Sequence, residues 1–222
     1  MRLGLICLVW LVSCASALAG PWPREKGSFF TSASVESPED GDTRELYYSA
    51  YAEYGMTDWL TLGFDGGTDY YTNGEGYAFA RVPIPVELGP HKFAVLGGVG
   101  ARMDESTLME RIYVLGASWG MGFESPLGPG WATLDGTLRH RRTSDSRLAK
   151  LDATLGLNRE SGQLWFAQLR YSNDTLAEEP IWEVAPSIAW PLWGAAKLET
   201  SASFGLQGSD QIKLKLGLWL EF

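Results

Sequence analysis

Several residue types are scarce in this chain of 222 residues. Its two cysteines, Cys7 and Cys14, both lie within the first twenty residues, and it has two histidines, His91 and His140. Removal of an N-terminal leader would therefore leave no cysteine for a disulfide or for a thiolate metal site. The two histidines have no ligand cluster around them in the sequence. We therefore expect neither a bound metal nor a cofactor.

Long apolar runs and basic clusters are missing as well. Beyond residue 19, no stretch approaches the roughly 18 apolar residues that a membrane-spanning helix requires. The formal net charge is -9, with 18 basic against 27 acidic residues. Because nucleic acid is held mainly by clustered Lys and Arg, this charge argues against a nucleic-acid partner. If the chain enters a membrane, it does so as strands.

The first nineteen residues have the pattern of a secretory signal peptide. Arg2 precedes the apolar run Leu3 to Val12, and Ala17-Leu18-Ala19 precedes Gly20. This run is too short to span a bilayer as a helix, and the small residues fit a cleavage site after Ala19. An alternative is that Leu11-Val12-Ser13-Cys14 is a lipoprotein processing box, which would place a lipid on Cys14. We assign residues 1–19 to the signal, 20–27 to a proline-broken lead-in and 28–222 to one domain.

Short alternating runs fill the rest of the chain. They are separated by Gly, Pro, Asp and Asn at intervals of about ten to twenty residues, without a competing helical period. This pattern predicts an all-β fold of about twelve strands, with ten or fourteen as alternatives if the Gly-rich hairpins between 92 and 141 divide differently. The predicted strands are 28–36, 44–55, 59–69, 77–87, 92–102, 111–123, 131–141, 148–158, 163–172, 181–190, 196–205 and 212–222.

The last predicted strand alternates strictly. Successive side chains on a strand point to opposite faces, so its even positions form one apolar stripe and its odd positions, which include Lys213 and Lys215, face the other way. This strand resembles the C-terminal insertion signal of bacterial outer-membrane β-barrel proteins, which alternates and ends in Phe or Trp. The insertion signal here comprises Leu214, Leu216, Leu218, Leu220 and Phe222.

The resemblance implies a transmembrane, antiparallel, up-and-down β-barrel in the outer membrane of a Gram-negative bacterium. It implies outer-membrane lipid around the wall and the barrel-assembly machinery as a partner of the C-terminal strand. Phe222 and the lead-in would then lie on the periplasmic side. The hairpin Ala52 to Gly63, which contains Tyr-Gly-Met-Thr-Asp, is similar to a turn of outer-membrane barrel families such as the phenol-degradation-operon group. It supports the barrel and does not identify a solute.

Successive strands run in opposite directions, so placing Phe222 on the periplasmic side assigns each connection either to the periplasmic end or to the outer end of the barrel. The periplasmic turns would be 56–58, 88–91, 125–130, 160–162 and 191–195. The outer loops would be 37–43, 70–76, 103–110, 142–147, 173–180 and 207–211, and we expect them to be somewhat longer and more acidic.

Charged residues share the parity that faces the lumen. A charge on the lipid side at mid-depth costs roughly 2 to 4 kcal/mol, so this segregation is itself an indication of the fold. The charges could form an ion-pair network that stiffens the wall, or they could line a selective polar pore. The candidate pore-lining residues are Asp65, Arg81, Arg102, Asp135, Arg139, Lys150, Asp152, Arg170, Glu199, Lys213 and Lys215.

Glycines and aromatic residues also fit a barrel. Glycines on the lumen side, among them Gly63, Gly98 and Gly156, could leave room for a solute or relieve crowding in the wall. Aromatic side chains at strand ends favour girdles at the headgroup level over a sugar-stacking path through the lumen. The predicted girdle contains Trp59, Tyr70, Tyr71, Trp131, Trp165, Tyr171, Trp182, Trp190, Trp193 and Trp219.

Catalytic chemistry finds little support. The candidate for a lipid hydrolase is His140 near the outer rim with Ser144 in the same phase, but Arg142 lies between them and no orienting acid is evident. The function that we predict is passive or weakly selective passage of small polar or charged solutes, as in a porin. Lys150, Arg170, Arg81, Lys213 and Lys215 would oppose Asp65, Asp135, Asp152 and Glu199 across a constriction. A structural or partner-anchoring barrel closed by internal ion pairs is the alternative.

Overall fold

The computed structural model describes residues 20–39, 46–69, 73–104, 107–209 and 211–222, and these form an all-β fold. The predicted signal peptide, Cys14, Tyr70 and Tyr71 lie outside the described residues. The strands are β1 (Phe29–Pro38), β2 (Tyr47–Thr57), β3 (Leu60–Asp69), β4 (Gly74–Pro83), β5 (His91–Asp104), β6 (Thr107–Phe123), β7 (Gly130–Arg141), β8 (Ser146–Asn158), β9 (Leu164–Asp174), β10 (Ile181–Pro191), β11 (Ala196–Gln207) and β12 (Ile212–Glu221). The predicted class and the predicted twelve strands are confirmed.

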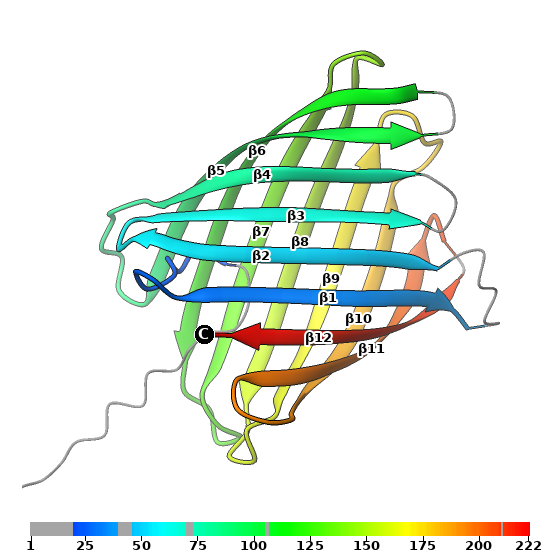
Figure 1. The fold of residues 1–222 in the computed structure, drawn as a ribbon. Helices are drawn as coiled ribbons and strands as arrows, with labels where there is room; N and C mark the ends of the chain where they lie inside the picture. Colours follow the sequence, from blue (N-terminus) through cyan, green and yellow to red (C-terminus); the bar gives the residue numbers. More distant parts are fainter. Residues whose placement is uncertain (1–19, 40–45, 70–72, 105–106, 210) are drawn as a thin grey trace, which may run out of the picture.

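The sheet closes on itself into an up-and-down barrel. Each strand pairs antiparallel with its chain neighbours, and β1 closes the cylinder against β12 from Phe30↔Glu221 to Pro38↔Lys213. Figure 1 shows that the C-terminus lies at the end of the barrel where β1 begins. We call this the C-terminal end and the opposite end the mouth. Closure removes the sheet edges that would leave backbone groups unpaired. Among the described residues, no helix has the length and apolarity needed to cross a membrane.

The outer surface of the wall is apolar, as the two-residue period predicts. On β12 the side chains of Leu214 and Leu216 are each 51% exposed, while Trp219 between the lipid-facing positions is 5% exposed. Leu155 of β8 and Val99 of β5 are 58% and 60% exposed on the same outward face. The insertion-signal side chains on β12 therefore lie on the apolar outer surface, and their contact with lipid and role in insertion stay predictions.

Two stretches depart from the predicted strand boundaries. β4 ends at Pro83 rather than at residue 87, because Pro83 and Pro85 lack the N–H groups of a regular ladder. Glu87 is exposed in the following connection. β5 continues to Asp104 and β6 begins at Thr107, so the two strands take up most of the predicted loop 103–110. With these boundaries the connections at the two ends are similar in length, so the expected length contrast is wrong.

Aromatic side chains occupy the C-terminal half of the lumen. Phe30, Trp131, Phe166 and Trp219 form a buried cluster with Leu164 and Ala189. Trp131 and Trp219 are only 4% and 5% exposed, so their assignment to a headgroup girdle is wrong. Both residues have the inward parity of their strands, which strand-end position alone did not reveal. By contrast, Trp59 is 59% exposed and Trp193 is 73% exposed.

Inward glycines make room for these rings. A Cβ atom added at Gly156 would overlap the ring of Trp131, and one added at Gly63 would overlap the ring of Phe79. Phe79 belongs to a second buried cluster with Tyr77, Ile112 and Val114. These glycines therefore relieve crowding between the wall and aromatic side chains rather than leaving open space for a solute.

Candidate functional site: the barrel lumen

The segment from Gly20 to Lys26, which we call the N-terminal segment, enters the C-terminal end of the lumen. Pro21 is fully buried and Arg24 is 8% exposed. A Cβ atom added at Gly120 of β6 would lie 2.7 Å from the Trp22 ring and 2.9 Å from Pro21, so both side chains pack on the inner wall. Trp22 also packs against the buried aromatic cluster. The segment and the aromatic cluster together fill this end of the barrel.

Arg24 fastens the N-terminal segment to the wall. Its Nε donates to Glu53 Oε2 at 2.7 Å and its Nη1 donates to Glu221 Oε1 at 2.9 Å. Its backbone N–H donates to Thr61 Oγ1 at 3.1 Å. These contacts join the segment to β2, β3 and β12.

Glu53 is the centre of this network. It is 1% exposed, and it pairs with Arg81 of β4 as well as with Arg24. The Tyr51 hydroxyl donates to Glu53 Oε1 at 2.5 Å. A buried carboxylate is tolerated only when paired charges and hydrogen bonds replace its hydration, and Glu53 has both.

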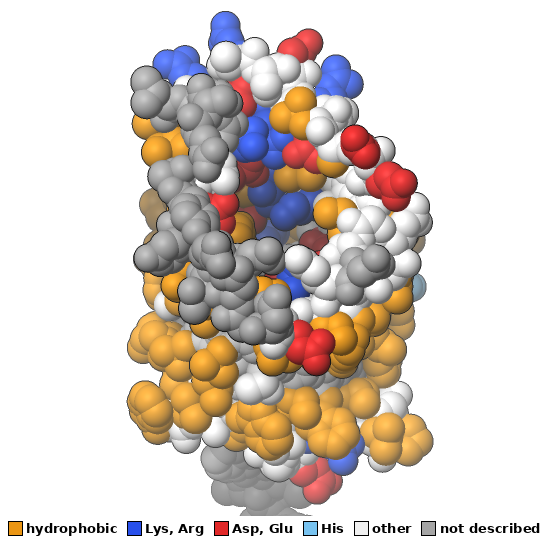
Figure 2. All heavy atoms as spheres, turned by 90° about the vertical axis from the view of Figure 1, so that its right-hand side faces the viewer, with side chains coloured by type: hydrophobic (Ala, Val, Ile, Leu, Met, Phe, Trp, Pro, Cys, Tyr) orange, Lys and Arg blue, Asp and Glu red, His pale blue; other side chains and the backbone are white. Residues whose placement is uncertain are grey.

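Polar cavities occupy the lumen between this closed end and the mouth. A cavity of about 240 Å³ is lined by charged side chains that include Asp65, Arg81, Asp135 and Arg139. A second cavity of about 380 Å³ is lined by Glu36, Tyr47, Arg170, Glu183 and Lys215 among others. The two adjoin, because Lys150, Asp152 and Gln168 line both. Figure 2 shows the hollow at the mouth, with basic and acidic side chains visible inside it.

Lys150 and Asp152 differ from the other lumen charges. They lie two residues apart on the inward face of β8, where they attract each other electrostatically. Within the described part of the chain, neither makes a hydrogen bond or an ion pair at bonding distance. Both charges therefore face the cavities rather than a fixed partner.

The register shows how these charges are arranged around the wall. Asp135 of β7 lies opposite Asp152 of β8, which in turn lies opposite Arg170 of β9. Arg170 lies opposite Glu183 of β10. Two carboxylates on adjacent strands would repel each other, and the cationic side chains beside them offset this repulsion.

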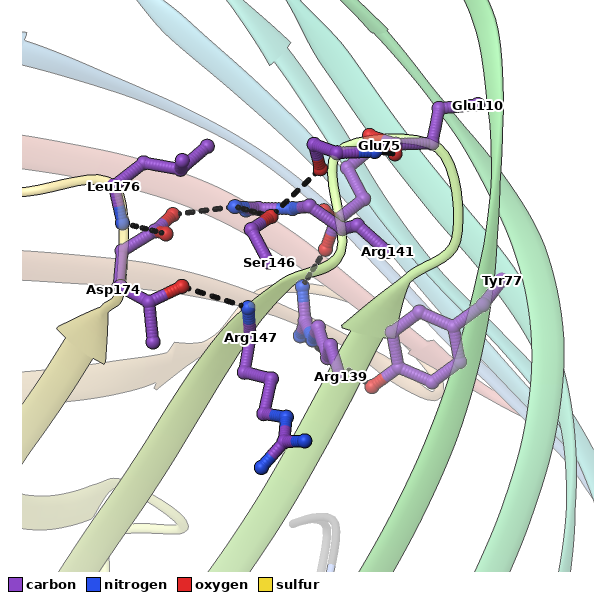
Figure 3. Close-up of polar contacts among 11 residues, drawn as sticks. Glu75, Tyr77, Glu110, Arg139, Arg141, Ser146, Arg147, Asp174 and Leu176 are labelled. Atoms are coloured by element: carbon purple, nitrogen blue, oxygen red, sulfur yellow. Dashed lines mark hydrogen bonds and ion pairs between the residues drawn. The ribbon is translucent and has the colours of Figure 1, made fainter.

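An arginine cluster joins distant strands near the mouth (Figure 3). Arg139 of β7 pairs with Glu75 of β4 at 2.5 Å. It also pairs with Asp65 of β3 at 3.2 Å. Arg141 pairs with Asp174 of β9 at 2.6 Å and with Glu75 at 3.4 Å. A single carboxylate, Glu75, therefore joins both arginines and ties the two sides of the barrel together.

Most of the remaining candidates are paired as well. Lys213 pairs with Glu183 at 2.8 Å, and Lys215 pairs with Glu199 at 3.0 Å. Glu199 is 2% exposed and also accepts the Trp219 indole N–H at 3.0 Å. Lys215 and Glu199 lie on the neighbouring strands β12 and β11, while Lys213 reaches past β11 to Glu183 of β10. Both contacts stay on one side of the wall, unlike the predicted opposition across a constriction.

Arg170 and Arg102 complete the set of candidates. Arg170 lies 3.7 Å from Glu36 and donates from Nη2 to Gln168 at 2.8 Å. Arg102 has the inward parity of β5 and lies opposite Glu110 in the register, but it does not line either cavity. The structure thus brings most of the predicted lumen charges together, while their role in passage stays a prediction.

The residues weighed for catalysis do not form a site. His140 points outward and its Nε2 lies 3.9 Å from Asp145. The Ser144 hydroxyl instead shares a 2.8 Å hydrogen bond with Ser146, and the Ser144 N–H donates to Glu110 at 2.5 Å. The described residues contain no group of three or more His, Cys, Asp or Glu side chains that could hold a metal ion.

The role of the N-terminal segment was not anticipated from the sequence. Sequence alone assigns Pro21, Trp22 and Pro23 to the proline-broken lead-in and does not place them in the lumen. A tryptophan between two prolines, followed by a basic residue, was a signal that this segment has an apolar surface to bury.

Comparisons with known proteins identify the fold. No family model matches the chain, and no curated protein matches it in sequence. Among solved structures, the KdgM porin aligns over 87% of this chain and 99% of its own, with 9% identity and a TM-score of 0.63. The same porin in complex with disordered oligogalacturonate aligns over 88% of this chain and 99% of its own, with 8% identity and a TM-score of 0.56.

An outer-membrane channel from Pseudomonas putida F1 is also similar. It aligns over 92% of this chain and 99% of its own, with 10% identity and a TM-score of 0.55. These likenesses show the fold. Together with the closed wall and its apolar outer surface, they show that the chain has the fold of the bacterial outer-membrane β-barrels.

Proposed function

We propose that the protein gives small polar or charged solutes passage across the outer membrane, with the N-terminal segment as a plug. The observation that carries this proposal is the pair of adjoining polar cavities, which meet at Lys150 and Asp152. A charge without a bonded partner can exchange its interaction with water for one with a solute. A charge in a tight ion pair would first have to lose its partner, which costs several kcal/mol. Lys150 and Asp152 are thus the lumen charges best placed to interact with an ion or dipolar molecule inside the cavities.

The N-terminal segment determines when passage occurs. The cavities lie on the mouth side of Arg81, and the N-terminal segment with its aromatic neighbours fills the lumen beyond. Passage across the whole barrel therefore requires that the segment leave its place. Structural neighbours of this fold include the KdgM porin in complex with disordered oligogalacturonate, which supports a solute path through a barrel of this fold.

A structural or partner-anchoring barrel is the second candidate. The network of Arg24, Glu53 and Arg81 favours it, because these buried ion pairs close the lumen and stiffen the wall. In that case the plug would not leave, and the cavities at the mouth would be closed pockets without a path behind them.

Ion selectivity in planar lipid bilayers tests the channel. Lys150→Glu reverses the charge that faces both cavities, and we expect the reversal potential in a salt gradient to shift towards cation selectivity. Arg147→Glu is the matched control: it makes the same charge change on β8, at an exposed outward position near the mouth. An equal shift in both variants would show a general surface-charge effect and remove Lys150 from the path.

The same recordings separate the two functions. Discrete conductance steps from folded protein support the channel. If neither the wild type nor a variant with a loosened plug conducts, while both migrate as folded barrels, the structural alternative is the correct one.

A further inference from the structure

A groove on the lipid-facing side of β8 to β11 is not used by the function proposed above. It has a volume of about 760 Å³ and begins beside Leu127, in the connection between β6 and β7 at the C-terminal end of the barrel. It continues along the wall past Trp165 and Ala167 to Pro186. An adjoining groove of about 410 Å³ shares Leu155 and Ala167 with it and extends towards Leu134 and Val184. Both are lined chiefly by apolar side chains.

Pro186 explains why the wall is recessed here. The pairing of β10 with β11 passes from Val184↔Phe204 directly to Ser187↔Ser201, so the ladder is interrupted at Pro186. Proline has no N–H to donate, which makes this position unsuited to a regular central strand. The Ser201 hydroxyl donates to the Pro186 carbonyl at 3.1 Å, and this bond satisfies a backbone acceptor at membrane depth.

Small side chains deepen the recess. Ala167 lies opposite Pro186 on β9, and Ala202 lines the same groove on β11. Larger residues rise on either side, since Leu155 is 58% exposed and Trp165 is 46% exposed. The result is a channel-like depression bordered by bulky apolar side chains.

A cation lies where the larger groove begins. The guanidinium of Arg159, in the connection between β8 and β9, lies 5.1 Å from the centroid of the Trp165 ring. Its Nη1 also donates to the Leu127 carbonyl. Leu127 and Trp165 both line the groove, so these contacts hold Arg159 at its opening. Tryptophan and arginine at this level fit the membrane interface, with the groove extending into the hydrocarbon layer.

We propose that the two grooves and Arg159 form a binding site for one phospholipid of the periplasmic leaflet. The acyl chains would lie in the two grooves on either side of Leu155, and the phosphate would accept hydrogen bonds from Arg159. Guanidinium groups bind phosphate through paired, charge-assisted hydrogen bonds, which ordinary lipid contacts along a barrel wall lack. The larger groove begins at the C-terminal end of the barrel. The resemblance of the final strand to an outer-membrane insertion signal implies that this end faces the periplasm, which selects this leaflet.

Native mass spectrometry of the delipidated, detergent-solubilised protein tests the site. The probes are phosphatidylethanolamine, the diacylglycerol with the same chains, and the soluble headgroup glycerophosphoethanolamine. We expect one phosphatidylethanolamine to bind more tightly than any further copies. Arg159→Gln, a change in a connection that leaves the strands intact, should weaken this binding about tenfold, as expected for the loss of charge-assisted hydrogen bonds. It should leave diacylglycerol binding unchanged.

A second variant tests the groove itself. Ala167→Phe fills the recess and should abolish the tight binding of both diacyl compounds. The controls are Arg147→Gln, an exposed arginine at the mouth end, and Ala78→Phe, an outward alanine on β4 away from the grooves. Both should bind phosphatidylethanolamine like the wild type.

Three results would overturn the proposal. Equal lipid binding by all variants would indicate only the ordinary lipid annulus around a barrel. Binding of the free headgroup as tightly as the whole lipid would point to an interfacial phosphate site without a role for the grooves. A dimer that dissociates in Ala167→Phe would show that a second copy of the chain covers this face.

Discussion

Arg24→Ala is the substitution that most directly loosens the plug. It removes the side-chain bonds to Glu53 and Glu221 while leaving the N-terminal segment's backbone bond to Thr61. Loss of one partner from a buried ion pair costs about 3 to 5 kcal/mol. The cost here is lower because Arg81 still pairs with Glu53, and the more exposed Glu221 contributes less than about 1 kcal/mol.

We therefore expect the seated plug to lose about 2 to 3 kcal/mol, a figure that rests on the typical strength of bonds to charged groups. At about 1.4 kcal/mol for each factor of ten, the released fraction should rise about 30- to 150-fold. The assay is single-channel recording in planar bilayers, with open probability as the readout. Lys26→Ala, an exposed change in the same segment, is the control and should behave as the wild type.

Heat-dependent gel migration shows whether each variant is a folded barrel. If folded Arg24→Ala has the same open probability as Lys26→Ala, the N-terminal segment is not what closes the lumen, and the reasoning from its contacts is wrong.

Three further changes test the packing of the wall and the lumen. Gly156→Val places a branched side chain against the Trp131 ring, so we expect destabilisation of about 1 to 3 kcal/mol in urea unfolding, and a wild-type midpoint would contradict the packing described. Lys215→Glu leaves Glu199 beside a second carboxylate at a site of low exposure. The unfolding midpoint of the variant should fall at neutral pH and recover in part as acid neutralises the pair. If the difference in midpoint between variant and wild type does not change with pH, this charge repulsion is excluded. Leu155→Arg puts a charge on the lipid face, and we expect a loss of about 2 to 4 kcal/mol if Leu155 lies near the midplane, against little change if that face is solvated.

The architecture could be predicted from the sequence because a transmembrane wall imposes a strict two-residue period. The final strand from Ile212 shows this period without interruption, and its inward and outward faces are those predicted. Strand ends were less certain where prolines intervene, as at Pro83. Proline can close a strand early or, as at Pro186, remain within one at a break in the ladder, and local sequence does not distinguish the two outcomes.

The lumen could be predicted only in part. Parity assigned charged residues such as Arg139 and Lys150 to the interior, but it could not show which of them pair. Arg139 reaches carboxylates on β3 and β4, a contact that depends on the shape of the closed barrel, while Lys150 faces a cavity. The girdle assignment of Trp131 and Trp219 follows from their place at strand ends, which is equally typical of an interfacial girdle, although both residues have the inward parity of their strands.

Site-directed labelling tests the central claim, that the polar lumen is open at the mouth and closed at the C-terminal end. Both cysteines of the chain lie within residues 1–19, so a cysteine introduced by Lys150→Cys is the only one in residues 20–222. We expect a charged, membrane-impermeant thiol reagent added to intact cells to modify Lys150→Cys quickly, and to modify Phe30→Cys at the closed end only when Arg24 is also replaced by Ala. Slow labelling of Lys150→Cys from outside, or fast labelling of Phe30→Cys with the plug intact, would contradict the account.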